Sequence, residues 1–268
     1  MLKKRLISCL LWREGTLVQS RQFQHTNSVG DALTAVDFFN TWAIDEIVLL
    51  DVSRTPKHRA LFHEHLRELS ERCFVPLAVG GWVTTLAEIR QLLSEGADKV
   101  VVNTAAVRDP NFITMASESF GAQCIVVSID AKKNTTGEYE VFVNRGKDAA
   151  GMRPDQLAKV SEERGAGEVF ITSIDHDGRQ AGYDMELVRL VRQATSVPVV
   201  ASGGVGEWSH LAEAIIEGGA DAVSAANIFH YSDQSTKKAK DYLKLVGIDV
   251  REPEFYKILL PRKPVYRV

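Results

Sequence analysis

Two glycine pairs in this chain stand where apolar runs end, and both have the chemistry of an anion site. Glycine lets backbone N–H groups approach an anion closely, and a following helix start favours negative charge. The two expected sites combine Gly80 and Gly81 with Asn103 and Thr104, and Gly203 and Gly204 with Ala226 and Asn227. We therefore expect a long substrate with a phosphate at each end. The alternative is that these glycines only serve tight turns.

Other residues modify these two expected sites. Asp177 and Gly178 follow the apolar run of residues 168–174, and we assign both to the phosphate-binding set. Trp82 weakens the first site, because a bulky residue replaces the small one that a phosphate would favour there.

Asp130 is the best candidate for acid–base chemistry. It ends the apolar run of residues 124–130, where partial desolvation would raise the pKa of a carboxyl group toward working pH. The alternative is an aspartate that caps the next loop. A loosely similar run, "RLISCLLWR" at residues 5–13, carries Leu11 at the matching place. One carboxylate is therefore missing from an otherwise similar pair.

Short β-branched runs that alternate with amphipathic stretches must position these groups. The expected strands are residues 5–11, 46–52, 76–81, 99–104, 124–130, 168–174, 198–202 and 222–226. The expected helices are residues 31–42, 58–72, 86–95, 111–120, 154–164, 185–194, 208–218 and 237–246. Eight such units predict an α/β fold, a single (β/α)8 TIM barrel, with reactive groups at the C-terminal ends of its strands.

The chain also repeats itself over a long period. "PLAVGGW" (76–82) is echoed by "PVVASGGV" (198–205), and "GADKVVVNTAAV" (96–107) by "GADAVSAANIF" (219–229). We therefore predict two half-barrel repeats, within a barrel domain of residues 1–248 and a C-terminal extension of residues 249–268. The long segment 132–152 contains an alternating run at 139–143, which predicts a small hairpin over one mouth.

Charged residues stand at or near the starts of four expected strands, at the opposite end of the barrel. They are Arg5, Glu46, Lys99 and Glu168. Two positive and two negative groups facing one another would form a neutral ring. From physical considerations alone, a structural plug of salt bridges is the preferred interpretation.

Composition excludes several function classes. The chain has 268 residues, 45% hydrophobic content and a net charge of −3, so it offers no basic field for nucleic acid. No apolar run is long enough for a signal peptide or a membrane span. The three scattered cysteines fit a reducing cytoplasm, and neither the cysteines nor the histidines suggest a metal site. We expect no cofactor.

Longer motifs resemble one enzyme family. "KRLISCL", "DEIVLLDV", "FGAQCIVVSIDAK", "TSIDHDG" and "SGGVG" are similar to the cyclase subunit of imidazole glycerol phosphate synthase, HisF, and the resemblance covers residues 1 to about 248. It implies that the charged ring gates an ammonia tunnel through the barrel. A class I glutaminase subunit, HisH, would dock at the bottom, where Asp98 and Gln123 match positions of the docking face.

The expected active site departs from the HisF pattern at three positions. The resemblance implies two catalytic carboxylates, at Asp130 and at the place of Leu11, and a lysine at the place of Gln19. Trp82 replaces a glycine of the first phosphate site. HisF-like paralogues with "CLL" in place of "CLD" supply ammonia for amidination of nucleotide-linked sugars, together with a third, ATP-using protein.

Three functions follow from these observations. The first is an ammonia-channelling subunit of a sugar-modifying amidotransferase with a phosphate-bearing acceptor. The second is a histidine-pathway cyclase that has shifted its acid–base group, for which Asp51 is the only evident replacement. The third is a non-catalytic activator or scaffold of the glutaminase.

Overall fold

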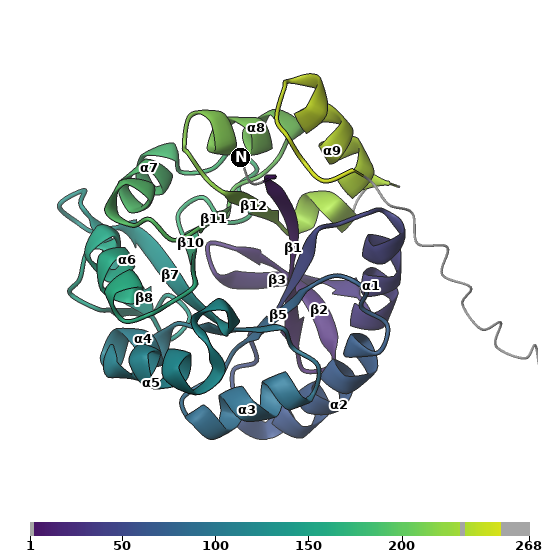
Figure 1. Ribbon diagram of the computed structural model, residues 1–268. Coiled ribbons are helices and arrows are strands. Elements are labelled where there is room, and N and C mark those ends of the chain that lie inside the picture. The colour runs from purple at the N-terminus through teal and green to yellow at the C-terminus, as the bar shows by residue number, and fades with distance from the viewer. Residues whose placement is uncertain (1–2, 231–233, 253–268) are drawn as a thin grey trace, which may run out of the picture.

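Eight parallel strands close into a barrel in the computed structural model, which describes residues 3–230 and 234–252 (Figure 1). The strands are β1 (Arg5–Arg13), β4 (Glu46–Asp51), β5 (Leu77–Gly80), β6 (Lys99–Val102), β7 (Ile125–Lys133), β10 (Glu168–Ser173), β11 (Val199–Ser202) and β12 (Ala222–Ala225). They pair in this order, and β12 pairs with β1 to close the ring. The predicted (β/α)8 fold is confirmed.

Helices surround the barrel on its outside (Figure 1). They are α1 (Ala32–Thr41), α2 (Arg59–Ser70), α3 (Leu86–Ser94), α4 (Thr104–Arg108), α5 (Asn111–Phe120), α6 (Pro154–Glu163), α7 (Met185–Ala194), α8 (Trp208–Ile216) and α9 (Ser235–Leu245), with 3-10 turns η1 (Pro56–His58), η2 (Ala122–Cys124) and η3 (Asn227–His230). Local chemistry sets several of the helix starts. Asp31 caps α1, and Thr85 with Glu88 forms a capping box at α3. The short helix α4 was not predicted.

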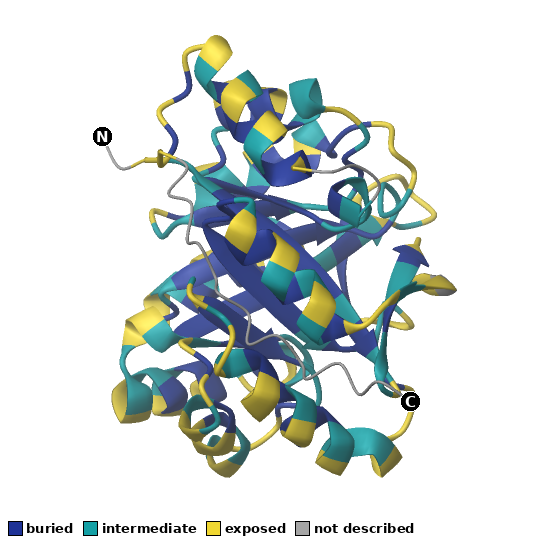
Figure 2. Cartoon of the chain, turned by 90° about the vertical axis from the view of Figure 1, so that its right-hand side faces the viewer, coloured by how far each residue is buried: buried dark blue, intermediate teal, exposed yellow. Residues whose placement is uncertain are grey.

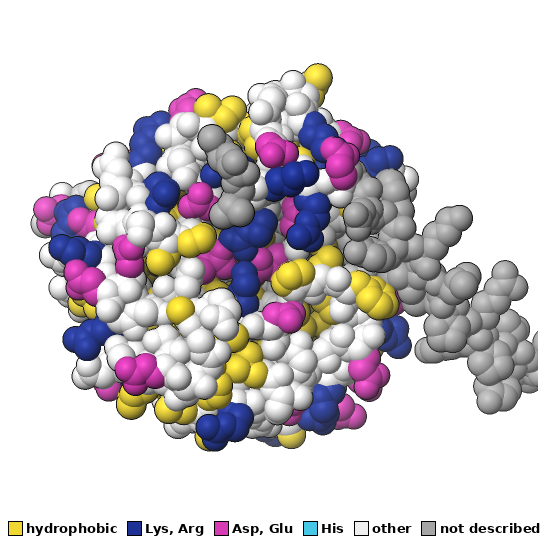
Figure 3. All heavy atoms as spheres, viewed as in Figure 1, with side chains coloured by type: hydrophobic (Ala, Val, Ile, Leu, Met, Phe, Trp, Pro, Cys, Tyr) yellow, Lys and Arg dark blue, Asp and Glu magenta, His cyan; other side chains and the backbone are white. Residues whose placement is uncertain are grey.

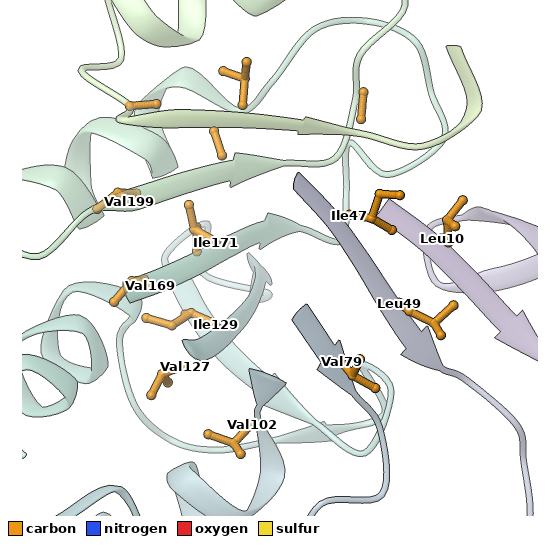
Figure 4. Packing of buried hydrophobic residues seen from close by; sticks show 14 of the residues in the cluster. Leu10, Ile47, Leu49, Val79, Val102, Val127, Ile129, Val169, Ile171 and Val199 are labelled. Atoms are coloured by element: carbon orange, nitrogen blue, oxygen red, sulfur yellow. The ribbon is translucent and has the colours of Figure 1, made fainter. Parts of the chain in front are cut away.

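The strands are buried on both faces, as parallel strands between helices must be (Figure 2). Side chains such as Ile47, Leu49 and Ile129 belong to the larger apolar cluster, shared with the helices (Figure 4). The intervening residues form a second cluster inside the barrel. Its buried members are Ile7, Cys9, Val48, Ala78, Val101, Val126, Phe170, Val200 and Ala222. The alternation along each strand therefore supplies an outer core and an apolar barrel interior.

The same hydrogen bond, from a backbone N–H to an aspartate carboxylate, recurs at the bottom of the barrel, where the strands begin. The Asp98 carboxylate accepts the Leu77 N–H at 2.8 Å, and the Asp221 carboxylate accepts the Val199 N–H at 3.1 Å. Both aspartates lie 18 positions after the first glycine of a Gly-Gly pair. The two halves of the chain thus fasten corresponding strands in the same way, which agrees with the repeat in the sequence.

Two strand hairpins extend the loops at the top of the barrel. β8 (Tyr139–Val143) pairs with the end of β7 and with β9 (Asp148–Ala149), which confirms the expected hairpin. β2 (Thr16–Arg21) and β3 (Gln24–Gly30) form a second, unpredicted hairpin after β1. At the other end of the chain, Val250 bridges to Lys4. Residues 253–268 of the expected extension lie outside the described residues, and the boundary at residue 248 stays a prediction.

Candidate functional site

A cavity of about 450 Å³ opens at the C-terminal ends of the barrel strands. This volume is within the range of small-molecule sites. Except for Gly80, the residues expected to bind phosphate or to move protons line it. They are Gly81, Asn103, Thr104, Asp130, Asp177, Gly178, Gly203, Gly204, Ala226 and Asn227. The barrel therefore brings one set of chemical groups together from six separate stretches of the sequence.

Asp130 lies on β7, three residues before its end, and lines this cavity. Burial raises the pKa of its carboxyl group to about 7, the hydrogen bond from the Ser128 hydroxyl at 3.2 Å opposes that rise, and the nearby Asp177 charge adds to it. A group with a pKa near neutrality exists in both protonation states and can therefore accept or donate a proton at working pH.

Asp177 fastens the unpredicted hairpin over the cavity. Its Oδ2 accepts the Ser20 hydroxyl at 2.6 Å and the Phe23 N–H at 3.1 Å, and its carbonyl oxygen accepts the Gln22 N–H at 3.0 Å. Burial raises the pKa of Asp177, and its two side-chain hydrogen bonds oppose that rise. Ser20 and Phe23 consequently line the cavity, although they had not been singled out. The segment "TLVQSR" does not alternate between apolar and polar residues, so periodicity gave no clear signal for this hairpin.

The first expected phosphate site is built around Gly81. Its φ is +100°, and a β-carbon there would lie 2.3 Å from the Asp51 carbonyl oxygen, so only glycine fits. Asn103 is held by a 3.0 Å hydrogen bond from its amide to the Ser128 carbonyl. The Thr104 hydroxyl accepts the Asn144 N–H at 3.3 Å. Trp82 follows Gly81 and lines the same part of the cavity.

The second expected phosphate site has the same kind of backbone. Gly203 and Gly204 have φ values of +90° and +109°. A β-carbon on Gly204 would lie 2.1 Å from the Gly182 carbonyl oxygen, so the loops are in close contact there. Asn227, the first residue of η3, follows Ala226 on the neighbouring strand–helix connection. Both expected sites therefore offer glycine backbone to a ligand in the cavity.

Among the described residues, no unpaired carboxylate near Leu11 replaces the second catalytic carboxylate that the resemblance places at that position. Leu11 lines the cavity and pairs in register with Leu50 of the next strand. Asp51, the evident replacement, lies one position further, but its Oδ2 is 3.2 Å from Arg59 Nη1 and its Oδ1 accepts the Ser53 N–H. The ion pair engages the carboxylate of Asp51, so this wall of the cavity presents apolar side chains and no evident proton acceptor.

The charged residues expected at the bottom do form a closed ring. Arg5 pairs with Glu46 at 2.5 Å and also with Glu168, and Lys99 pairs with Glu46 at 2.8 Å and with Glu168 at 3.0 Å. Both glutamates are buried. Figure 3 shows basic and acidic side chains gathered at the centre of this face. The apolar barrel interior lies between the ring and the cavity.

Asp98 and Gln123, the two residues expected at a docking face, differ in their surroundings. Asp98 lies at the bottom of the barrel, where its carboxylate is committed to the Leu77 N–H. Gln123 is exposed in η2, just before β7. No partner chain is present in the structure, so their role in docking stays a prediction.

Within residues 3–230 and 234–252, no three histidine, cysteine or carboxylate side chains are grouped so that they would hold a metal ion. No helix in the same ranges is long and apolar enough to cross a membrane.

Comparison with known protein families finds a match over most of the chain. The model of a family described as "Histidine biosynthesis protein" matches residues 5–235. The match runs from the first barrel strand to the start of α9, so it includes all eight barrel strands and every residue placed above in the cavity and the ring.

Proposed function

This chain belongs to the histidine biosynthesis protein family, and on that premise we propose that it is the barrel subunit of a glutamine-dependent amidotransferase. Enzymes of this family are TIM barrels that act as an isomerase or a cyclase in the histidine pathway. The proposed subunit receives ammonia from a HisH-like glutaminase and delivers it to a phosphate-bearing, nucleotide-linked sugar. A third, ATP-using protein activates the acceptor.

The closed ring of ion pairs below an apolar interior is the observation that carries this proposal. Desolvation makes buried ion pairs weak stabilisers, and well-packed apolar residues often serve a core as well or better. The ring is therefore weak evidence for a stabilising role, and the resemblance to HisF, in which such a ring gates an ammonia tunnel, favours a passage over a plug. Neutral ammonia crosses an apolar interior far more easily than ammonium, since charge is expensive in a medium of low dielectric constant.

Asp130 supplies the proton chemistry at the upper end of that passage. When ammonia adds to the activated carbon of the acceptor, a C–N bond forms and the nitrogen must lose a proton. The Asp130 carboxylate accepts that proton, while the activated oxygen leaves with its phosphoryl or nucleotidyl group. One carboxylate is sufficient for this step, and the apolar wall at Leu11 is compatible with it.

The histidine-pathway cyclase is the second candidate, because the family match favours it. That reaction is expected to use two carboxylates, and removing one acid–base group typically costs about 10²-fold to 10⁴-fold in rate. The ion pair between Asp51 and Arg59 removes the evident substitute. The apolar wall therefore favours the amidotransferase.

A turnover experiment with the cyclase substrate separates the two candidates. The wild type, Leu11→Asp and Leu50→Asp are each mixed with ammonium and the ribulosyl aminoimidazole nucleotide. Leu50→Asp makes the same chemical change on the neighbouring strand and is the matched control. The proposal expects a silent wild type. Activity in Leu11→Asp but not in Leu50→Asp would place the lost chemistry at position 11, whereas silence in all three proteins would leave Gln19 and Trp82 as further blocks. Turnover by the wild type at an ordinary enzymatic rate would establish the cyclase instead.

Ammonia delivery is tested separately with a HisH-like glutaminase from the same organism. Glutaminase activity is measured with and without this chain, and again with Glu46→Gln, which disturbs the ring. The proposal expects the wild type to stimulate the glutaminase. Product formation from glutamine should fall in Glu46→Gln, while product formation from added ammonium should persist. If product formation from glutamine and from added ammonium fell equally in Glu46→Gln, the ring would have no role in ammonia delivery.

A further inference from the structure

Trp82 has an unusual backbone for a bulky residue. Its φ is +60°, in the left-handed region, which β-carbon sterics disfavour for all residues except glycine. Such conformations persist where surrounding structure holds them, and they concentrate at ligand sites. Trp82 lines the top cavity directly after Gly81. The structure therefore holds an aromatic ring at the place where a small residue would have suited a phosphate.

A second loop holds the Trp82 ring in place. The guanidinium of Arg145, from the connection between β8 and β9, lies over the indole at 5.8 Å from the ring centroid. Arg145 Nη1 donates to the Ser53 carbonyl at 2.8 Å, and its own φ is +61°. The neighbouring Asn144 N–H binds the Thr104 hydroxyl. These contacts join the loops after β4, β5, β6 and β8 along one edge of the cavity.

The positive charge of the cavity is concentrated at the same edge. Arg108 and Arg145 are the only cationic side chains among the described residues that line it. Neither has a carboxylate partner within the described ranges, whereas the nearby Arg59 pairs with Asp51. Arg108 lies one turn after Thr104 on α4, on the same helix face. Guanidinium groups without acidic partners are well suited to phosphate oxygens.

We propose that this edge binds a nucleoside diphosphate, with the base stacked on Trp82 and the phosphates on Arg108 and Arg145. A planar base uses both features at once, since aromatic side chains stack on any base and guanidinium groups bind its phosphates. This inference rests on the proposed function, because it names the end of the acceptor that this site holds. The sugar then extends toward Asp130.

Binding to the full chain tests the inference without any turnover. Calorimetric titrations at fixed ionic strength use UDP, CDP, ADP, GDP and inorganic pyrophosphate. We expect at least one nucleotide to bind at least about tenfold more tightly than pyrophosphate, as one stacked base allows. Trp82→Gly should abolish that preference and leave pyrophosphate affinity unchanged. Trp82→Phe should retain part of it, and Arg108→Gln with Arg145→Gln should weaken both classes of ligand.

Thermal unfolding of each variant shows whether the variant is folded. Glycine adopts positive φ freely, so Trp82→Gly should fold, and Trp82→Phe provides a second measurement if it does not. Trp208 lines a separate surface cavity beside α8 and α9, and Trp208→Phe is the matched control. It should leave all affinities unchanged.

Three results would each overturn the inference. They are the lack of any nucleotide that exceeds pyrophosphate by tenfold, a preference that survives in Trp82→Gly, and a preference that is lost in Trp208→Phe. The titrations need neither ammonia nor a glutaminase. Nucleotide binding through Trp82 with failed ammonia delivery would refute the proposed function alone, and ammonia delivery without the preference would refute this inference alone.

Discussion

Replacing Asp130 with asparagine should change how the stability of the protein depends on pH. Burial raises the pKa of this carboxyl group from 3.8 to about 7. Between about pH 4 and pH 7 the folded chain keeps a proton on Asp130 that the unfolded chain has released. The free energy of unfolding of the wild type therefore falls as pH rises through this window. The asparagine side chain is neutral throughout, and its amide oxygen can still accept the Ser128 hydroxyl.

The size of the effect follows from the two pKa values. From pH 5 to pH 8 the wild type should lose about 3 kcal/mol of unfolding free energy relative to Asp130→Asn. Urea unfolding of both proteins at pH 5, 6, 7 and 8 measures this difference. Asp241→Asn makes the same chemical change at an exposed position on α9 and is the control. Its curve should run parallel to that of the wild type.

Parallel pH profiles for the wild type and Asp130→Asn would refute the reasoning. They would mean that Asp130 is hydrated well enough to ionise as it does in the unfolded chain. The desolvated proton acceptor on which the proposed chemistry depends would then be absent. A divergence confined to the range below pH 5 would likewise place the pKa too low for proton transfer at neutrality.

Three further predictions concern the free energy of unfolding, measured in each case by urea unfolding. Gly81→Ala should lower it by more than about 2 kcal/mol, because the added methyl group meets the Asp51 carbonyl. Gly137 also has a positive φ but lies in open space, so Gly137→Ala should lower it by only about 1 kcal/mol, and equal losses would contradict the prediction. Lys240→Met should cost about 3 kcal/mol by leaving Asp45 buried without the cation that lies 2.6 Å away. Adding Asp45→Asn should recover part of that loss, and a single variant costing under about 1 kcal/mol would show that Asp45 is rehydrated. Arg5→Met removes one of the two ring cations and should cost about 2 kcal/mol, with no measurable loss arguing that the ring reorganises freely.

Much of the architecture was readable from periodicity. Eight apolar runs alternating with amphipathic stretches predicted the barrel, and all eight expected strands are present. The ends of those runs predicted the residues that line the cavity, because parallel strands in a barrel all end at one face. The β2–β3 hairpin was missed, since its second strand, "QHTNSVG", is polar and carries no apolar alternation.

The states of individual site residues were less accessible from the sequence. Asp51 and Asp130 both end apolar runs of the sequence. The carboxylate of Asp51 is paired with Arg59, whereas burial raises the pKa of Asp130 to about 7. Asp177 lines the cavity and its role in phosphate binding stays a prediction, but the sequence did not indicate that its carboxylate accepts hydrogen bonds from Ser20 and Phe23. The sequence did not distinguish these three carboxylates, because the burial of Asp130 depends on closure of the barrel and the partners of Asp177 come from a distant loop.

The sequence by itself determined the order of the elements, their buried faces and the end of the barrel at which the chemistry lies. These properties depend on interactions between neighbours along the chain and on the apolar faces that must be covered. Only the tertiary structure decided which charges meet and which stay unpaired. The approach of Arg145 to Trp82 and the ring joining Arg5 to Glu168 link residues far apart in the sequence. Closure of the barrel sets those distances, and distance and burial together set the charge state and the chemistry of each group.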